Sequence, residues 1–134
     1  MEYSRDIFTR ISPPRLVEVK MNRYERNSQE LTIRIFDDYK TSIKEKNVDV
    51  IFTRKCIFEP DKFFVISTTF VVTLDLNMEL ENITQEEING KIKNDIGYIL
   101  DNALAKSSMI VSNLSNEIFG MPLVTQPVYS PEEQ

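Results

Sequence analysis

Alternating apolar and polar residues run through the first half of the chain and predict β-strands. The alternation is clearest at residues 31–36, 48–58 and 63–76, and a shorter strand is expected at 15–21. The segment 63–76 is also rich in the β-branched and aromatic residues that favour strands. Its apolar face consists of Phe64, Ile66, Phe70, Val72, Leu74 and Leu76. Residues 15–76 are therefore predicted to contain four strands.

Polar segments separate these strands and predict the connections between them. Residues 22–30 form one polar turn, and Asp37-Asp38 opens a charged connection that reaches residue 47. The segment 59–62 has the proline and aspartate typical of a hairpin turn. Before the first strand, Pro13-Pro14 stops any helix, so residues 1–14 are expected to be extended.

The hydrophobic period changes after residue 76 and predicts one long helix over residues 84–116. Thr84-Gln85-Glu86-Glu87 is a capping box, in which the Thr hydroxyl and the Glu carboxylate satisfy backbone amides at the helix start. An apolar stripe at helical spacing follows it. Gly90 and Gly97 each cost the helix about 1 kcal/mol relative to Ala. The final stretch, 117–134, contains three prolines and is expected to be extended.

The apolar residues of this helix lie on more than one of its sides, which indicates self-association. One sheet is not expected to cover them all, so a second subunit should pack against the helix. The candidate interface residues are Ile96, Ile99, Ala103 and Ile110.

Composition bounds the class of protein. The chain has 134 residues, of which 41% are hydrophobic, enough for a single α+β domain, 1–134, with a real core. No apolar run approaches the roughly 18 residues of a membrane span, and the first ten residues lack the apolar region of a secretory signal. One cysteine, Cys56, cannot form an internal disulfide, so the cytoplasm is the expected compartment. The net charge of −5 argues against nucleic acid as a partner.

Few residues are suited to catalysis. The chain has no histidine, which removes the commonest general base and metal ligand. Cys56 lies on an apolar strand face without a base beside it and is interpreted as a core residue. The acidic pairs Asp37-Asp38 and Glu86-Glu87 are interpreted as a turn and a helix start. The chain's three glycines are not spaced as a phosphate-binding loop. We therefore expect no enzyme activity, no metal and no cofactor.

A set of apolar residues belongs to weakly patterned, proline-containing segments at both ends of the chain. They either cap the core beside the helix or line an adaptable groove for extended apolar peptides, and the sequence leaves both interpretations open. The candidates for the client-binding groove are Phe8, Ile11, Phe119, Met121, Leu123 and Tyr129.

The order of these segments resembles the SecB export-chaperone family. The opening run Tyr3-Ser4-Arg5-Asp6-Ile7, the hairpin around residues 56–61 and the post-helix stretch EIFGMPLVTQPVY each resemble the corresponding SecB segment. The resemblance implies a SecB-like fold, with a four-stranded antiparallel sheet, one long helix packed across it, and a homotetramer built as a dimer of dimers. It also implies ATP-independent holding of unfolded polypeptides.

In SecB proteins an acidic face of the sheet docks the motor SecA. By resemblance, the docking residues here are Asp6, Ile57 and Glu59. Arg10 departs from the family pattern, because SecB has an acidic residue at that position.

Three functions remain open at this stage. The first is a chaperone that holds unfolded preproteins for export. The second is a SecB-like adaptor dedicated to one partner, such as an antitoxin. The third is a purely structural oligomer, which would have no affinity for unfolded chains.

Overall fold

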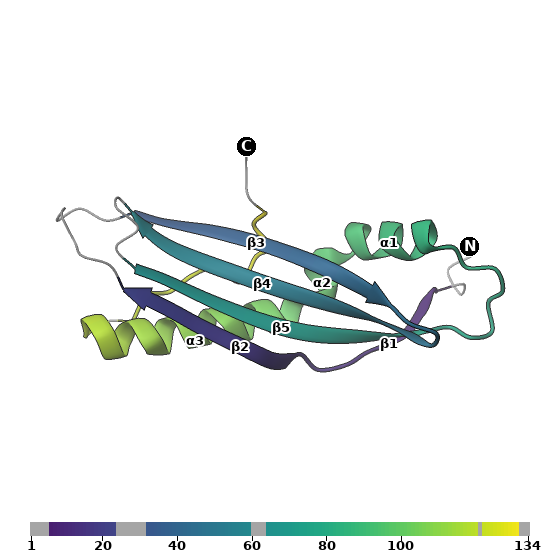
Figure 1. Cartoon of the computed structure of the whole chain (residues 1–134), viewed down its shortest axis with the longest axis horizontal. Coiled ribbons are helices and arrows are strands. Elements are labelled where there is room, and N and C mark those ends of the chain that lie inside the picture. Colours follow the sequence, from purple (N-terminus) through teal and green to yellow (C-terminus); the bar gives the residue numbers. More distant parts are fainter. Residues whose placement is uncertain (1–5, 24–31, 60–63, 121, 132–134) are drawn as a thin grey trace.

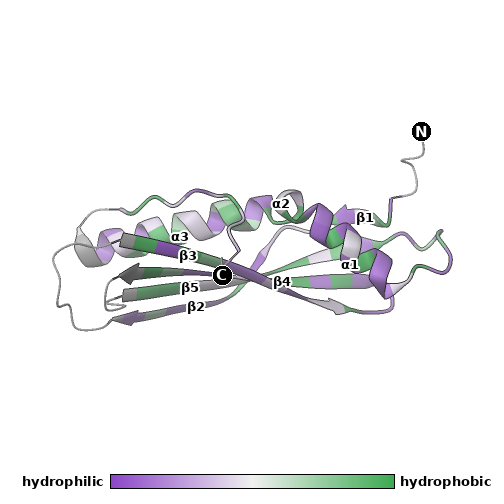
Figure 2. Ribbon diagram, turned by 90° about the horizontal axis from the view of Figure 1, so that it is seen from above, coloured by the Kyte–Doolittle hydropathy of each residue, from purple (hydrophilic) through white to green (hydrophobic). Residues whose placement is uncertain are grey.

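An antiparallel sheet forms one layer of the molecule, and three consecutive helices lie on one face of it (Figures 1 and 2). The computed structural model describes residues 6–23, 32–59, 64–120 and 122–131. The strands are β1 (Phe8–Ile11), β2 (Arg15–Arg23), β3 (Thr32–Ile43), β4 (Asn47–Glu59) and β5 (Phe64–Leu76). The helices are α1 (Gln85–Asn94), α2 (Ile96–Ile99) and α3 (Asp101–Phe119).

The sheet has four strand positions, and its first position is shared by two strands. β3, β4 and β5 pair antiparallel in sequence order. β2 pairs with the first part of β5, from Phe64 to Val71, and β1 pairs with its last part, from Leu74 to Leu76. Pro13 and Pro14 separate β1 from β2, since proline has no N–H to give to the ladder. The fold class is thus confirmed, and the segment expected to be merely extended contributes a short strand.

The connection predicted at residues 37–47 is wrong. β3 continues through Asp37 and Asp38 to Ile43, and the turn is confined to the next few residues, where the Lys44 N–H donates to the Asn47 carbonyl at 2.8 Å. Asp37 remains in the strand because it lies opposite Arg54 of β4, and the two charges pair. The predicted turns at 22–30 and 59–62 lie for the most part outside the described residues.

The core lies between the inner face of the sheet and the helices. Alternate residues of β4 and β5 are buried there, as the alternation predicted. Burying a side chain of this size stabilises the fold by about 1.5–3 kcal/mol. The main cluster contains Val48, Val50, Phe52, Phe70, Val72 and Leu74 of the sheet and Ile88, Ile92, Ile99, Leu100, Ala103 and Leu104 of the helices. A second cluster fills the other end of the space between the sheet and the helices and consists of Cys56, Ile66 and Val111.

The helical layer begins as predicted but is interrupted twice. Thr84 and Glu87 form the expected capping box. The backbone leaves helical geometry at Asp95 (φ −107°, ψ 19°) and at Leu100 (φ −96°, ψ 10°), so the continuous helix predicted over 84–116 is wrong. Gly97, a poor helix former, lies between the two breaks. Within the described part of the chain, no helix is long and apolar enough to cross a bilayer.

Candidate functional site

Two neighbouring hollows lie between the first strand and the short helix α2, and we call them together the β1–α2 groove. One, of about 460 Å³, is lined by Asp6 and Phe8–Ile11 on one side and by Lys91, Asp95, Tyr98 and Ile99 on the other. The second, of about 290 Å³, is lined by Ile11–Pro14 and by Tyr98, Ile99, Asp101 and Asn102. Because Ile11, Tyr98 and Ile99 line both hollows, the two form one continuous surface.

The β1–α2 groove combines exposed apolar side chains with charged ones, of which two cations are paired. Tyr98 is 76% exposed and Ile11 is 36% exposed. Two lining cations have partners: Lys91 Nζ lies 3.0 Å from Asp95 Oδ2, and Arg10 Nη1 lies 3.8 Å from Asp75 Oδ2. The hydrogen bond to Asp95 raises the pKa of Lys91. Such a surface suits apolar segments of varied sequence.

The structure divides the candidate client-binding residues among three places. Phe8 and Ile11 line the β1–α2 groove, whereas Leu123 packs against the cluster of Cys56. Tyr129 packs on the main core. The side chain of Phe119 and the whole of Met121 lie outside the described residues. A single groove lined by all six is therefore not seen among the residues described.

Tyr129 has the properties of a core residue. Its ring lies edge-on to Tyr39 at 6.1 Å between centroids, and 6.4 Å from the ring of Phe52. Burial raises the pKa of Tyr129 to about 12. For this residue the structure supports the core interpretation. Tyr98, the largest exposed aromatic of the groove, was missed because it falls outside the apolar stripe of the helix and looked like a surface residue.

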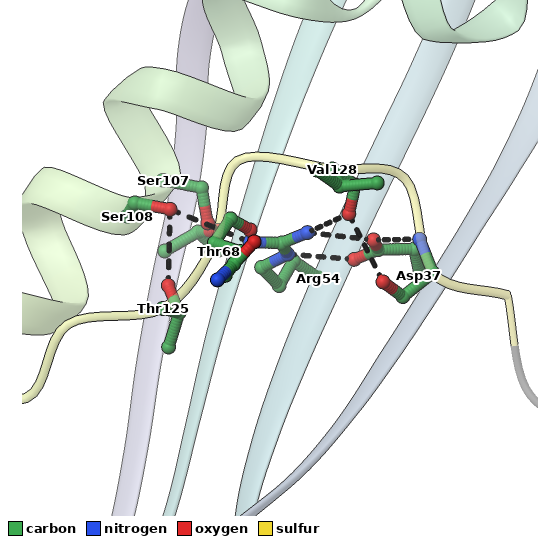
Figure 3. A network of polar contacts seen from close by, with 9 residues as sticks. Asp37, Arg54, Thr68, Ser107, Ser108, Thr125 and Val128 are labelled. Atoms are coloured by element: carbon green, nitrogen blue, oxygen red, sulfur yellow. Dashed lines mark hydrogen bonds and ion pairs between the residues drawn. The ribbon is translucent and has the colours of Figure 1, made fainter.

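The segment 122–131, which we call the C-terminal strap, crosses the inner face of the sheet and is bound there by a buried ion pair (Figure 3). Arg54 and Asp37 have fully buried side chains and pair through two contacts of 2.8 Å. Arg54 Nη1 donates to the Gln126 carbonyl at 3.0 Å, and Nη2 donates to the Val128 carbonyl at 2.7 Å.

Both ends of the strap are also fixed. The Ser130 N–H donates to Asp37 Oδ2 at 2.7 Å, and the Asp37 N–H donates to the Ser130 carbonyl at 2.8 Å. Towards α3, the Leu123 N–H donates to Ser115 Oγ at 2.8 Å, and Thr125 Oγ1 donates to Ser108 Oγ at 3.0 Å. Among the described residues, no buried side-chain polar atom lacks a partner. The strap is therefore held through its backbone and through the packed side chains of Leu123, Thr125 and Tyr129.

β2 presents an apolar edge to solvent. Its aliphatic side chains are all between 40% and 50% exposed: Leu16, Val17, Val19 and Met21. β2 pairs with β5 on one side only, so its other side is an open strand edge within the described chain. Soluble proteins normally protect such an edge, which makes β2 a candidate interface.

The predicted oligomer residues face the sheet instead of solvent. Ile99 and Ala103 are buried in the main core, and Ile96 and Ile110 are half-buried against it. Within a single chain the helical stripe follows the sheet, and the assignment of these four residues to a subunit interface stays a prediction. In a single chain, β2 exposes more apolar surface than these four positions do.

The residues matched to the SecA-docking surface do not lie together in this chain. Asp6 lies beside Asn77, just beyond the end of β5, where Asn77 Nδ2 donates to its carbonyl at 3.0 Å. Ile57 pairs with Val65, near the start of β5. β5 has 13 residues, and about 3.4 Å per residue separates its ends by roughly 40 Å. The side chain of Glu59 is outside the described set.

Cys56 is buried, as predicted for a core cysteine. Burial raises the pKa of its thiol to about 11, although the nearby Arg54 opposes this. The thiol is therefore neutral at pH 7, whereas a nucleophilic cysteine needs a lowered pKa. No group of three or more cysteine and acidic side chains in the described ranges could hold a metal ion.

No protein-family model matches the sequence, and a search of curated proteins gives no match. Among solved structures, a SecB-like chaperone of Mycobacterium tuberculosis, in complex with a ChAD peptide from the HigA1 antitoxin, has a TM-score of 0.68 and 14% identity. The match covers 87% of this chain and 88% of that one. A protein of unknown function from Streptococcus agalactiae has 12% identity and a TM-score of 0.43, with 87% of this chain and 94% of that chain covered. The match to the SecB-like chaperone, with its TM-score of 0.68, shows that this chain has the SecB-like fold.

Proposed function

We propose that this protein is a chaperone of the SecB type, which binds non-native polypeptides in the cytoplasm without using ATP. The β1–α2 groove carries the proposal. It offers Tyr98 and Ile11 to solvent next to the half-buried Phe8, and its two cations Arg10 and Lys91 are paired. The structural neighbour, which is bound to a peptide, supports the same kind of ligand.

The groove is suited to clients of varied sequence. A holding chaperone cannot depend on specific side-chain hydrogen bonds, because its clients share none. Burying one large apolar side chain contributes about 1.5–3 kcal/mol, and part of this is lost in ordering the client. Several weak contacts along an extended chain are therefore needed for useful affinity.

Two specialisations of this activity remain candidates. In one, the protein holds preproteins for export and docks SecA. In the other, it serves a single partner, such as an antitoxin. The antitoxin peptide on the structural neighbour favours the second. The wide separation of Asp6 and Ile57, together with Arg10 in place of an acidic residue, gives little support to SecA docking.

We also propose self-association, with a homotetramer built as a dimer of dimers as the expected assembly. The exposed apolar side chains of β2 support it, because a second copy paired there would cover them and the open strand edge.

A binding experiment tests the groove. A fluorescent, permanently unfolded protein is titrated with the wild type, with Tyr98→Ser plus Ile11→Ser, and with Met109→Ser. Met109 is 63% exposed on α3 and is the matched control, because it lies outside the groove. The double variant should bind about tenfold more weakly or worse, since each 1.4 kcal/mol changes affinity tenfold.

The control should bind like the wild type. Equal affinity of all three proteins would place the client elsewhere. Binding of the unfolded protein to none of them would reject the chaperone function itself.

A further inference from the structure

The strap is recognised through its main chain. Arg54 binds two of its carbonyls, and Asp37 binds the N–H and the carbonyl of Ser130 through its carboxylate and its own amide. Neither Val124, which is 83% exposed, nor Val128, which is 57% exposed, inserts its side chain deeply. A polypeptide that adopts a comparable turn offers the same carbonyls and amides.

A turn presents both carbonyls to Arg54. The Val128 N–H donates to the Gln126 carbonyl at 2.8 Å, which closes a three-residue turn centred on Pro127. Proline fixes φ near the value that such an inverse γ-turn needs. The two carbonyls therefore converge on one guanidinium group (Figure 3).

A buried ion pair is not needed if its only role is to hold a segment against the core. Taking two charges out of water offsets most of their attraction, and apolar residues of equal volume usually hold a core together as well. Arg54 and Asp37 instead make four donor–acceptor contacts with the strap's backbone. Main-chain recognition explains the presence of these charges.

The edge of β3 offers more pairing than the strap uses. The strap pairs with β3 as a single parallel bridge, between Asp37 and Pro131. Because main-chain groups alternate in direction along an antiparallel strand, Ile35 and Tyr39 carry their N–H and C=O towards the same edge as Asp37. An incoming extended chain could pair at these residues also, which the strap does not do.

We propose that Asp37, Arg54, Ser108 and Ser115 form a second polypeptide-binding site, the strap site, which the chain's own strap occupies until an extended client segment replaces it. The fitting ligand is an extended segment with a central proline and apolar residues six positions apart, the spacing of Leu123 and Tyr129. This inference rests on the proposed function, since it names a second place where a non-native polypeptide binds.

Hydrogen exchange on the full-length wild type tests the replacement directly. Exchange is followed with and without saturating reduced, carboxymethylated α-lactalbumin, a permanently unfolded probe. Two backbone amides serve as reporters. The Ser130 N–H donates to the Asp37 carboxylate, and the Asp37 N–H donates to the Ser130 carbonyl. If the probe takes the strap's place, the Ser130 amide loses protection, whereas the Asp37 amide keeps it because the probe now pairs there.

A variant provides the second arm. Ser130→Pro removes the N–H donated to Asp37 and leaves the sheet untouched. It should loosen the strap and raise the affinity of the protein for the probe about tenfold, because the strap loses one hydrogen bond to a charged group. Val128→Ala is the control, because it keeps the carbonyl that Arg54 binds. If Ser130→Pro does not fold, the exchange experiment on the wild type decides alone.

The remaining outcomes separate this inference from the proposed function. If the probe binds and both amides keep their protection, the strap is a fixed part of the core and the strap site is rejected, while the chaperone function stands. If both amides lose protection, the strap leaves without being replaced, which also rejects the site. If the probe does not bind at all, both proposals fail.

Discussion

Arg54 is the residue on which the arrangement of the sheet's inner face depends most. It is fully buried, it pairs with Asp37, and it holds the strap through two carbonyls. Thr68 and Ser107, bonded at 2.7 Å, extend this polar row beneath α3. The row divides the core, with the Phe52 cluster on one side and the Cys56 cluster on the other.

We predict that Arg54→Met destabilises the protein by about 3–5 kcal/mol, because Asp37 is left as a buried charge without its ion partner. Urea denaturation at pH 7 measures the change. Lys55→Met, one position along and exposed, should change the free energy of unfolding by less than about 0.5 kcal/mol. Equal, small effects of both substitutions would show that the ion pair is not needed.

Cys56 should resist thiol reagents in the native protein, because its thiol is buried and neutral at pH 7. Its pKa is raised from 9.0 to about 11, so between these values the unfolded chain ionises the thiol and the folded chain does not. Stability contributed by Cys56 is therefore present below pH 9 and declines above it. The advantage of the wild type over Cys56→Ala should shrink by about 1 kcal/mol from pH 7 to pH 10. Rapid labelling at pH 7 would contradict this.

Single residues were the hardest features to predict from the sequence. Asp37 in a polar run is typical of a turn, and only the strand register reveals that Arg54 lies opposite it. By contrast, Cys56 was interpreted correctly, since an apolar strand face is enough to indicate burial. Tyr98 was missed because its place in the groove depends on segments that are distant in the sequence.

At the scale of elements, hydrophobic period predicted the strands and the helical region well. β4 and β5 match their expected bounds within one residue. The breaks at Asp95 and Leu100 escaped prediction, because the apolar stripe continues through them. The helical layer bends where α1, α2 and α3 follow the twisted sheet (Figure 1). The position of these bends depends on packing against the sheet, which a sequence pattern does not predict.

The glycines of the helical layer provide a matched pair of substitutions. Gly90→Ala should stabilise the protein by about 0.5–1 kcal/mol, because Gly90 lies inside α1 and nothing lies within 4 Å of the added methyl group. Gly120→Ala should destabilise it by about 1 kcal/mol or more, because Gly120 caps α3 at φ 78°. Thermal unfolding of both variants checks the difference, and an equal shift in Tm would contradict the assigned helix end.

At the scale of the whole molecule, the proposed binding surfaces are formed by segments that are distant in the sequence. The β1–α2 groove brings residues near position 10 against residues near position 98. The sequence identified Phe8 and Ile11 as client-binding candidates, but it could not predict that they lie beside Tyr98. It left Leu123 and Tyr129 open between the same groove and the core, and in the structure both pack against the core while Arg54 holds their segment to the sheet.

Assembly is predicted to depend on β2. Val19→Lys should shift the protein towards smaller species in light scattering, because it places a charge on the apolar edge strand that a second copy would cover. Lys106→Ala, an exposed change on α3, is the control. If Val19→Lys leaves the molar mass unchanged, or the wild type is already monomeric at micromolar concentration, β2 is not a self-association surface.

The central claim is that the protein distinguishes non-native from native polypeptides. The most direct measurement is fluorescence anisotropy of one labelled protein, in its native form and in its reduced, carboxymethylated form, titrated with the wild-type chain. We predict saturable binding of the unfolded form only, and weaker binding after Tyr98→Ser plus Ile11→Ser. Equal binding of both forms, or binding of neither, would contradict the account.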